Sequence, residues 1–258
     1  MSDNKQVQPT NEPIPFCDLE TGVCSIPEVT RGDARVTAPE PTREILYIGD
    51  PMCSWCWGIS PGLKELEAEA ERKGIPFSIL VGGLRPGGGD PWTPRFRDFL
   101  RHHWEEIGAR SGQPFSLELL ERESFNYDTE PAARAFVVMR AMLQEARAPE
   151  SRLYEMFAEI QRKFYVDNED PTMPDFFKSI CDAYELDYEA FLARFDTPNA
   201  KQATKEEFQK VRALGVSGFP TVLYRDGDEL RLLASGYSTG PRMVAALNSA
   251  SAQPRVAR

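Results

Sequence analysis

Two cysteines in the segment Cys53-Ser54-Trp55-Cys56 have the residue type and the spacing that thiol chemistry requires. An apolar, β-prone run ends just before them in a Gly-Asp-Pro turn, and a helical pattern begins with them. A helix N-terminus favours an anion because it carries unpaired backbone N–H groups and the positive end of the dipole. We therefore expect Cys53 to be an attacking thiolate, with its pKa lowered from about 8.5 into a range of roughly 3.5–7.5. Cys56 follows one turn later on the same face and would resolve a mixed disulfide.

A CxxC pair also occurs in zinc sites and among core cysteines that do no chemistry. A structural zinc site needs a second ligand pair at matching spacing. The other candidate ligands lack that spacing; they are Cys17, Cys24, His102 and His103. A redox dithiol is favoured because the pair lies between a strand and a helix of a βαβ pattern. We expect no metal and no cofactor.

The N-terminal region contains a second pair of cysteines. Prolines interrupt residues 1–42 and no apolar periodicity persists there, so we expect an extended, partly disordered tail. Within it, Cys17 and Cys24 bracket a hairpin-like C-x6-C loop with a Thr-Gly turn. Three interpretations stay open: idle thiols, a second dithiol that exchanges with the first, or part of a metal site. Cys181 lies on an apolar helix face, which predicts a buried core thiol.

The elements around Cys53 form a βαβ pattern. Residues 44–49 and 76–83 are typical of strands, and a helix from Cys53 to Lys73-Gly74 connects them. Pro61 removes one i→i−4 hydrogen bond and should kink this helix. The short connections predict two parallel strands with a right-handed crossover.

The rest of the chain is helical and then returns to strands. Helices are predicted at about 94–110, 130–146, 150–165, 173–185, 187–195 and 202–214, and Asp128 or Thr129 could cap the second. An Asp-Gly turn between apolar runs predicts an antiparallel hairpin at 221–225 and 230–234, followed by a last helix to about 250. These elements predict an α/β fold with a mixed sheet over residues 43–90 and 205–250, and an all-helical insertion over 91–204.

A proline-containing segment precedes the predicted hairpin. Pro220 follows a Gly-containing turn and directly precedes a strand, where a cis bond is plausible. Near the cysteines, Trp55 offers an apolar platform for a partner chain. An ordinary trans proline is the alternative at Pro220.

Charge and hydropathy exclude some partners. The net charge of −10 argues against nucleic acid and against an anionic membrane surface. No run approaches the roughly 18 apolar residues that span a bilayer, and the first residues lack the apolar core of a secretory signal. We expect a cytoplasmic protein.

The CSWC motif, the helical insertion and the segment Gly215-Val216-Ser217-Gly218-Phe219-Pro220-Thr221 resemble the thioredoxin-fold oxidoreductases of the DsbA family. The resemblance is nearest to the cytoplasmic protein-disulfide isomerase branch close to the FrnE-like proteins. It implies that Cys53 and Cys56 are the redox pair, that Pro220 is the cis-proline, and that Phe219 contacts the substrate backbone. Ser-Trp stands where the strongly oxidising periplasmic members have Pro-His. We therefore expect a reductase or isomerase of protein disulfides, recharged by the thioredoxin or glutathione system.

A related branch of this fold, the SpxH/YjbH-like adaptors, delivers a transcription factor to a protease. Residues 103–112 also resemble that branch. In this alternative the helical insertion is a docking surface and the thiols sense redox state. Retention of Cys53, Cys56 and Pro220 together favours the enzyme.

Overall fold

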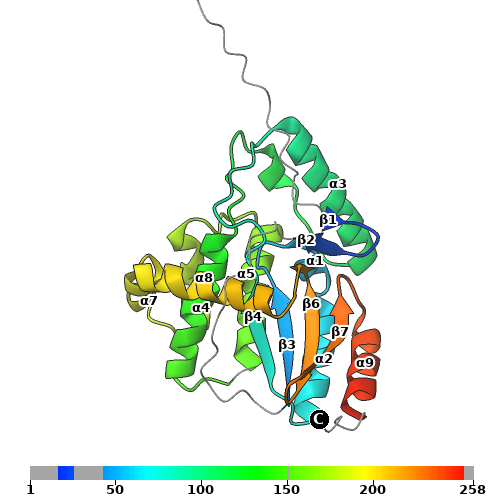
Figure 1. Ribbon diagram of the computed structural model, residues 1–258. Helices are drawn as coiled ribbons and strands as arrows, with labels where there is room; N and C mark the ends of the chain where they lie inside the picture. Colours follow the sequence, from blue (N-terminus) through cyan, green and yellow to red (C-terminus); the bar gives the residue numbers. More distant parts are fainter. Residues whose placement is uncertain (1–16, 26–42, 150, 253–258) are drawn as a thin grey trace, which may run out of the picture.

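The computed structural model describes residues 17–25, 43–149 and 151–252. Its main sheet has the strand order β4-β3-β6-β7, with β3 parallel to β4 and antiparallel to β6. Figure 1 shows α9 beside β7 and α2 behind the sheet, with α4, α5, α7 and α8 beyond β4 and α3 above the strand ends, next to β1 and β2. The strands are β3 (Arg43–Gly49), β4 (Phe77–Val81), β6 (Thr221–Asp226) and β7 (Glu229–Ser235). The expected α/β architecture with a mixed sheet is confirmed.

The connection from β3 to β4 is the predicted helix, broken in two near Pro61. The pieces are α1 (Ser54–Gly58) and α2 (Ser60–Arg72), with Ile59 between them. Proline has no N–H to donate to the carbonyl oxygen of Trp57. That oxygen instead accepts from Ser60 Oγ at 2.7 Å and from Gln113 Nε2 at 3.1 Å. The break therefore does not leave the carbonyl oxygen of Trp57 unsatisfied.

The C-terminal part completes the sheet. The Asp-Gly turn joins β6 to β7 as expected, and α9 (Gly240–Ala252) follows. A short strand β5 (Gly218–Phe219) precedes β6 but belongs to a second sheet, of order β1-β2-β5. Its other strands are β1 (Cys17–Asp18) and β2 (Val23–Ser25). Residues 17–25 of the predicted tail thus form a hairpin, whereas 1–16 and 26–42 lie outside the described residues.

The helical insertion lies between β4 and β5. Its members are α3 (Pro94–Ser111), η1 (Glu118–Glu121), α4 (Glu130–Glu145), α5 (Ser151–Tyr165), η2 (Pro174–Phe177), α6 (Lys178–Ala183), α7 (Tyr188–Phe195) and α8 (Pro198–Ala213). The predicted start of the last helix at 202 is wrong. Thr197 Oγ1 accepts from the N–H of Ala200 and caps the helix, with Pro198 in its first turn. The 173–185 helix is a 3₁₀ turn followed by a short α-helix, and η1 was not predicted.

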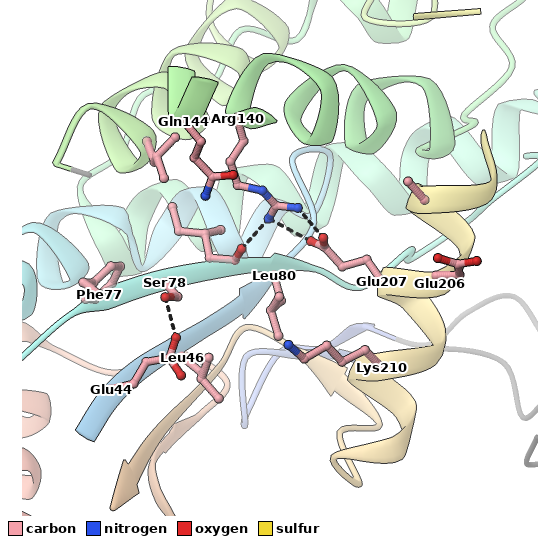
Figure 2. Close-up of a pocket in the computed structure, with 13 residues that line it drawn as sticks. Glu44, Leu46, Phe77, Ser78, Leu80, Arg140, Gln144, Glu206, Glu207 and Lys210 are labelled. Carbon is pink, nitrogen blue, oxygen red and sulfur yellow. Dashed lines mark hydrogen bonds and ion pairs between the residues drawn. The ribbon is translucent and has the colours of Figure 1, made fainter. Parts of the chain in front are cut away.

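Arg140 of α4 and Glu207 of α8 attach the insertion to the edge strand β4 (Figure 2). Glu207 Oε1 accepts from the backbone N–H of Val81 at 2.7 Å, and Arg140 donates to the carbonyl oxygen of Ile79 at 2.7 Å. The two side chains also pair with each other. An edge strand exposes backbone groups that can pair with other chains. Here the insertion satisfies them, beside a cavity of about 420 Å³ whose lining includes this pair.

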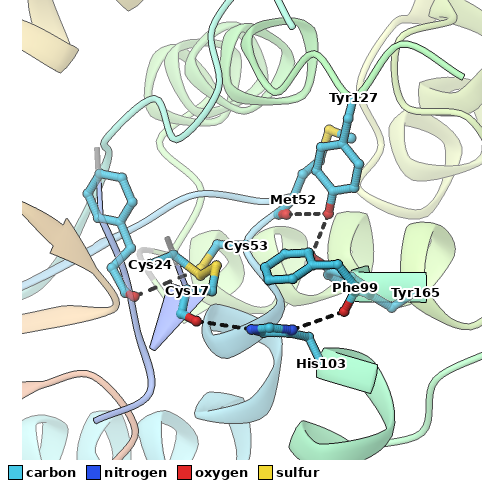
Figure 3. Close-up of a disulfide and its surroundings, with 9 residues drawn as sticks. Cys17, Cys24, Met52, Cys53, Phe99, His103, Tyr127 and Tyr165 are labelled. Atoms are coloured by element: carbon cyan, nitrogen blue, oxygen red, sulfur yellow. Dashed lines mark hydrogen bonds between the residues drawn. A yellow bond between two sulfur atoms is a disulfide. The ribbon is translucent and has the colours of Figure 1, made fainter. Parts of the chain in front are cut away.

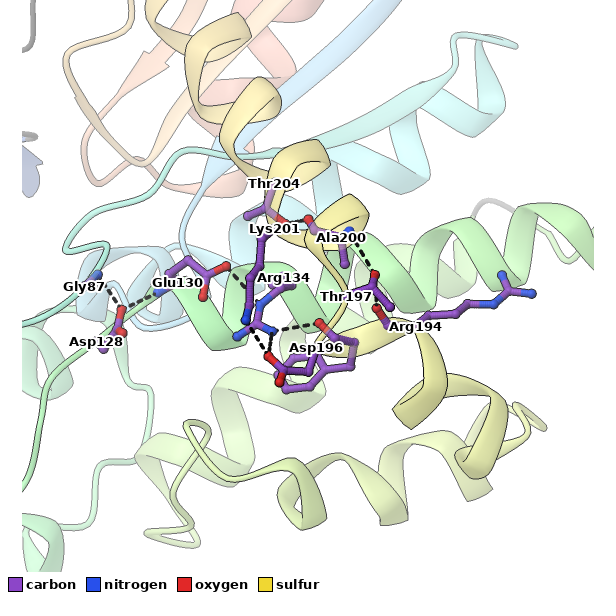
Figure 4. A network of polar contacts seen from close by, with 11 residues as sticks. Gly87, Asp128, Glu130, Arg134, Arg194, Asp196, Thr197, Ala200, Lys201 and Thr204 are labelled. Carbon is purple, nitrogen blue, oxygen red and sulfur yellow. Dashed lines mark hydrogen bonds and ion pairs between the residues drawn. The ribbon is translucent and has the colours of Figure 1, made fainter.

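A second arginine joins the helices of the insertion to each other (Figure 4). Arg134 is 6% exposed and donates to the carbonyl oxygen of Phe195 at 2.7 Å. It also pairs with Glu130 on its own helix and with Asp196 after α7. Lys201 of α8 contacts the same Asp196 carboxylate at 2.7 Å. α4, α7 and α8 are thereby held as one unit against the sheet edge.

No helix within residues 17–25, 43–149 and 151–252 is long and apolar enough to cross a bilayer.

Candidate functional site

Asp50 fixes the turn that presents Cys53. Its two carboxylate oxygens accept from the backbone N–H of Met52 at 2.9 Å and of Leu84 at 2.7 Å. Its backbone oxygen accepts from the N–H of Cys53 at 3.0 Å. Asp50 is fully buried, and burial raises the pKa of its carboxyl from 3.8 to about 6. The carboxyl thus ties the end of β3 to the segment after β4 and sets the position of the first cysteine.

Cys53 occupies the N-cap position of α1, with extended backbone dihedral angles of φ −89° and ψ 118°. The sulfur lies 4.0 Å from the carbonyl oxygen of Phe219. The Phe219–Pro220 peptide bond is cis, the form that the local sequence made plausible and that the family resemblance implied, and the trans alternative is wrong. The Phe219 ring lies so close to Gly82 that a Cβ at that position would overlap it. The structure therefore brings Cys53, Phe219 and Pro220 together.

Cys56 lies one turn into the helix, fully buried and against Tyr47 of β3. A Cβ at Gly49 would lie 2.5 Å from the Tyr47 hydroxyl and 3.2 Å from Cys56 Sγ. Glycine at this position therefore allows the hydroxyl and the sulfur to approach the end of the strand. Burial, with Cys56 as the next cause, raises the pKa of the Tyr47 hydroxyl well above 10.0, so the phenol stays neutral.

The expected lowering of the Cys53 pKa is wrong for this structure. Cys53 is fully buried, and burial is the main cause that raises the pKa of its thiol well above 9.0. A hydrogen bond and charge interaction with Cys56 add to the rise. Loss of water disfavours the thiolate more than the start of a five-residue helix favours it. The side chain is not close to solvent: it belongs to a buried apolar cluster that also contains Cys24 of the 17–25 hairpin.

That hairpin carries the second cysteine pair. Cys17 and Cys24 form a disulfide, whereas Cys53 and Cys56 are free thiols. Figure 3 shows the disulfide beside Cys53, and Cys24 and Cys53 belong to one buried apolar cluster. The interpretation of Cys17 and Cys24 as two unpaired thiols in an extended tail is therefore wrong. The fifth cysteine, Cys181, is buried in the core as expected, and burial raises the pKa of its thiol to about 11.

The remaining zinc candidates do not converge on a metal site. The two ring nitrogens of His103 lie 2.9 Å and 3.0 Å from the carbonyl oxygens of Phe99 and Cys17. Across the described ranges, no group of three or more His, Cys, Asp or Glu side chains could hold a metal ion. His103 is instead a hydrogen-bonding contact to the hairpin.

Trp55 is also covered by the chain itself. Its ring packs against Tyr237 at 5.6 Å between centroids, and the Arg110 guanidinium lies 5.5 Å from the Trp55 centroid. Trp55 is fully buried, so the expected platform is occupied in this structure. Sequence reasoning missed Arg110, Tyr237 and Asp50 as site residues. Only Asp50 carried a local signal, the Gly-Asp-Pro turn before the cysteines.

A CxxC pair at the start of a helix, next to a cis-proline loop at the end of a mixed sheet, defines a thioredoxin-like dithiol protein. The chain belongs to the family described as the DSBA-like thioredoxin domain, whose model matches residues 47–247. The fold class expected from the sequence is therefore confirmed, including the helical insertion.

Two solved structures and a group of curated proteins resemble the chain. A candidate protein disulfide isomerase from Nitrosomonas europaea is 33% identical, with a TM-score of 0.71 over 80% of this chain and 96% of that chain. The cytosolic disulfide reductase DsbM from Pseudomonas aeruginosa, solved with GSH, is 25% identical, with a TM-score of 0.62 over 81% and 98%. The ClpXP adapter protein SpxH from Shouchella clausii is 26% identical over 219 residues, 83% of this chain and 67% of that protein.

Proposed function

We propose that this protein is a cytoplasmic thiol-disulfide oxidoreductase that reduces or isomerises protein disulfides through Cys53 and Cys56. The observation that carries the proposal is the position of Cys53 Sγ, 4.0 Å from the carbonyl oxygen that precedes the cis-proline. This arrangement places a nucleophilic sulfur beside a backbone edge on which an extended polypeptide can pair. A second thiol, Cys56, follows one helical turn later.

The reaction follows from these positions. Once the hairpin moves aside and water reaches Cys53, its thiol loses a proton, and the thiolate attacks one sulfur of a substrate disulfide, forms a mixed disulfide and releases the other substrate sulfur as a thiolate. The Cys56 thiolate then attacks Cys53 Sγ, which releases the second substrate thiol and leaves a Cys53–Cys56 disulfide. Two molecules of a thiol such as glutathione restore the dithiol and leave as their own disulfide. In isomerisation the substrate's freed thiolate displaces Cys53 instead, with no net electron transfer.

The relatives support this proposal. The DsbM structure is that of a cytosolic disulfide reductase with GSH, which favours glutathione as the reductant and the cytoplasm as the location. The Nitrosomonas protein favours isomerisation of protein disulfides. Protein substrates would bind at Phe219 and Pro220, with no cofactor and no nucleic acid. Trp55 would contact them once the hairpin moves aside.

Trapping through Cys53 tests the proposal. Cys56→Ala removes the resolving thiol, so mixed disulfides with substrate proteins should accumulate and be identified by mass spectrometry. Cys53→Ala/Cys56→Ala is the matched control and should trap nothing. The wild type should reduce insulin disulfides with glutathione as electron donor. If Cys56→Ala traps no partner and the wild type does not reduce insulin, the proposed oxidoreductase function is wrong.

A second function, redox-sensing adaptor, is favoured by the curated relatives named ClpXP adapter protein SpxH. In this alternative the insertion from α3 to α8 is the docking surface for a partner that is handed to a protease. A pull-down separates the two functions. Recovery of one transcription factor with a protease, at an amount unchanged by Cys53→Ser, would support the adaptor.

A further inference from the structure

The 17–25 hairpin is held to the site through its backbone. Arg110 Nη1 donates to the carbonyl oxygens of Leu19 at 2.8 Å and Glu20 at 3.2 Å. The N–H of Tyr237 donates to the carbonyl oxygen of Thr21 at 3.2 Å. These contacts recognise main-chain oxygens, as a site for varied polypeptides must, because it cannot depend on side-chain identity.

The His103 ring adds another contact of the same kind. Its Nε2 lies 3.0 Å from the carbonyl oxygen of Cys17, and its Nδ1 lies 2.9 Å from that of Phe99 on α3. Arg110, His103 and Tyr237 come from α3 and from the segment after β7, so the hairpin joins two distant parts of the chain (Figure 1).

The strand β2 lies along the edge next to the nucleophile. Cys24 pairs antiparallel with Phe219, and Ser25 pairs with Gly218. The carbonyl oxygen of the same Phe219 lies 4.0 Å from Cys53 Sγ. A Cβ at Gly218 would lie 2.3 Å from Val23 Cγ1 and 3.1 Å from the carbonyl oxygen of Cys24, so any larger residue would push β2 away from β5. β2 thus occupies the backbone edge that an extended substrate would need.

We propose that the hairpin is a tethered disulfide substrate of the Cys53/Cys56 pair, with Cys24 as the sulfur that Cys53 attacks. This inference rests on the proposed function. The Cys53 thiol gives up its proton as it forms a bond to Cys24 Sγ, the Cys17–Cys24 bond breaks, and Cys17 leaves as a thiolate that takes up a proton from water. Cys56 then attacks Cys53 Sγ and releases Cys24 as a thiol. The active pair is oxidised, the hairpin pair is reduced by the same two electrons, and an external disulfide gains access only by displacing β2.

The positions of the two hairpin cysteines identify the attacked sulfur. Cys24 is fully buried in the apolar cluster that contains Cys53 and Cys56. Cys17 is half-buried, packs on the outside of that cluster, and has its carbonyl oxygen turned to His103. The leaving thiolate should be the sulfur with better access to water, because water stabilises the charge. Figure 3 shows Cys53 near the disulfide and His103 at the carbonyl oxygen of Cys17.

Two double variants test the inference, since each leaves one hairpin cysteine opposite Cys53. Cys17→Ser/Cys56→Ser keeps Cys24, and Cys24→Ser/Cys56→Ser keeps Cys17. Each purified full-length protein is treated with oxidised glutathione, and its disulfides are mapped by mass spectrometry of unreduced peptides. The first variant should form an intramolecular Cys24–Cys53 bond at least about tenfold faster than the second forms Cys17–Cys53, because orientation dominates such reactions.

Equal rates in the two variants, or glutathionylated Cys53 in place of the Cys24–Cys53 bond, would overturn the inference. Cys17→Ser/Cys24→Ser separates its failure from failure of the proposed function. This variant lacks the internal disulfide but keeps the active pair, so it should still reduce insulin. If this variant reduces insulin but no Cys24–Cys53 bond forms in Cys17→Ser/Cys56→Ser, the proposed oxidoreductase activity stands and only the inference that the hairpin is a tethered substrate is refuted.

Discussion

Cys24 and Phe219 are antiparallel partners across β2 and β5, and the carbonyl oxygen of that phenylalanine lies 4.0 Å from Cys53 Sγ. Phe219 therefore contacts the hairpin through its strand pairing and the nucleophile through its carbonyl oxygen. Any change in how β2 lies on β5 should change the access of water and reagents to Cys53.

Removing the Arg110 side chain should loosen the hairpin. Arg110→Ala loses hydrogen bonds to two carbonyl oxygens and the contacts of the guanidinium with the Trp55 and Tyr237 rings. If these contacts contribute about 1.4 kcal/mol to holding the hairpin in place, their loss would raise the fraction of molecules with a displaced hairpin about tenfold. Alkylation of Cys53 by iodoacetamide in the reduced protein, followed by mass spectrometry, should accelerate by that factor. Arg101→Ala on the same helix, where Arg101 pairs with the exposed Glu121, should not accelerate it.

A side chain at Gly82 should displace the Phe219 ring and the cis-proline loop. The Cβ of Gly82→Ala would overlap that ring, and overpacking in a core typically costs about 1–3 kcal/mol. We expect a lower free energy of unfolding in urea and slower insulin reduction. Gly108→Ala is the matched control, since its nearest neighbour would lie at 3.3 Å and the position is helical. Equal losses in both variants would contradict this account of the loop.

The buried carboxyl of Asp50 should make stability depend on pH. Its pKa is raised from 3.8 to about 6, so between these pH values the folded protein holds a proton that the unfolded chain has released. The stabilisation that this proton gives the folded protein is complete below about pH 3.8 and is lost as the pH rises through about 6. The free energy of unfolding of the wild type, measured against Asp50→Asn, should fall by roughly 2.4 kcal/mol between about pH 4 and pH 7. A difference between the two proteins that does not change with pH would rule this out.

Glu207 should be required to hold the insertion against the sheet. Glu207→Gln removes the charge that pairs with Arg140, and both side chains are largely buried. Breaking one partner of such a pair costs on the order of 3 kcal/mol, because the other charge stays buried. Glu145→Gln, whose exposed pair with Arg194 is 2.9 Å long, should cost roughly 0.5 kcal/mol or less. Urea unfolding of the two variants measures both values, and a similar cost would show that burial of the pair adds nothing.

Sequence predicted the features that short stretches encode. The βαβ unit, the break near Pro61 and the Asp-Gly hairpin each depend on neighbouring residues, and all are present. The cis bond at Pro220 was also suggested by its local context. The apolar pattern predicts too late a start for α8, because the Thr197 cap lies outside that pattern.

The environment of Cys53 could not be read in the same way. β1 and β2 contain two and three residues, too few for any periodicity to appear. The groups that hold them, Arg110 and Tyr237, are distant in the sequence and carry no motif. The helix start alone predicts a lowered pKa for Cys53, whereas burial in a cluster to which the non-local hairpin contributes Cys24 raises it.

The hairpin also has a consequence for the order of events on the ribosome. Residues 17–25 leave the exit tunnel before Cys53, but their partner strand at Gly218–Phe219 and the Tyr237 contact are synthesised after the whole insertion. β3 likewise cannot pair with its antiparallel neighbour β6 until that strand has been synthesised. While the chain grows, Cys53 and Cys56 are therefore without their cover, and the nascent protein passes through a stage in which both of its cysteine pairs can react with other molecules before they meet each other.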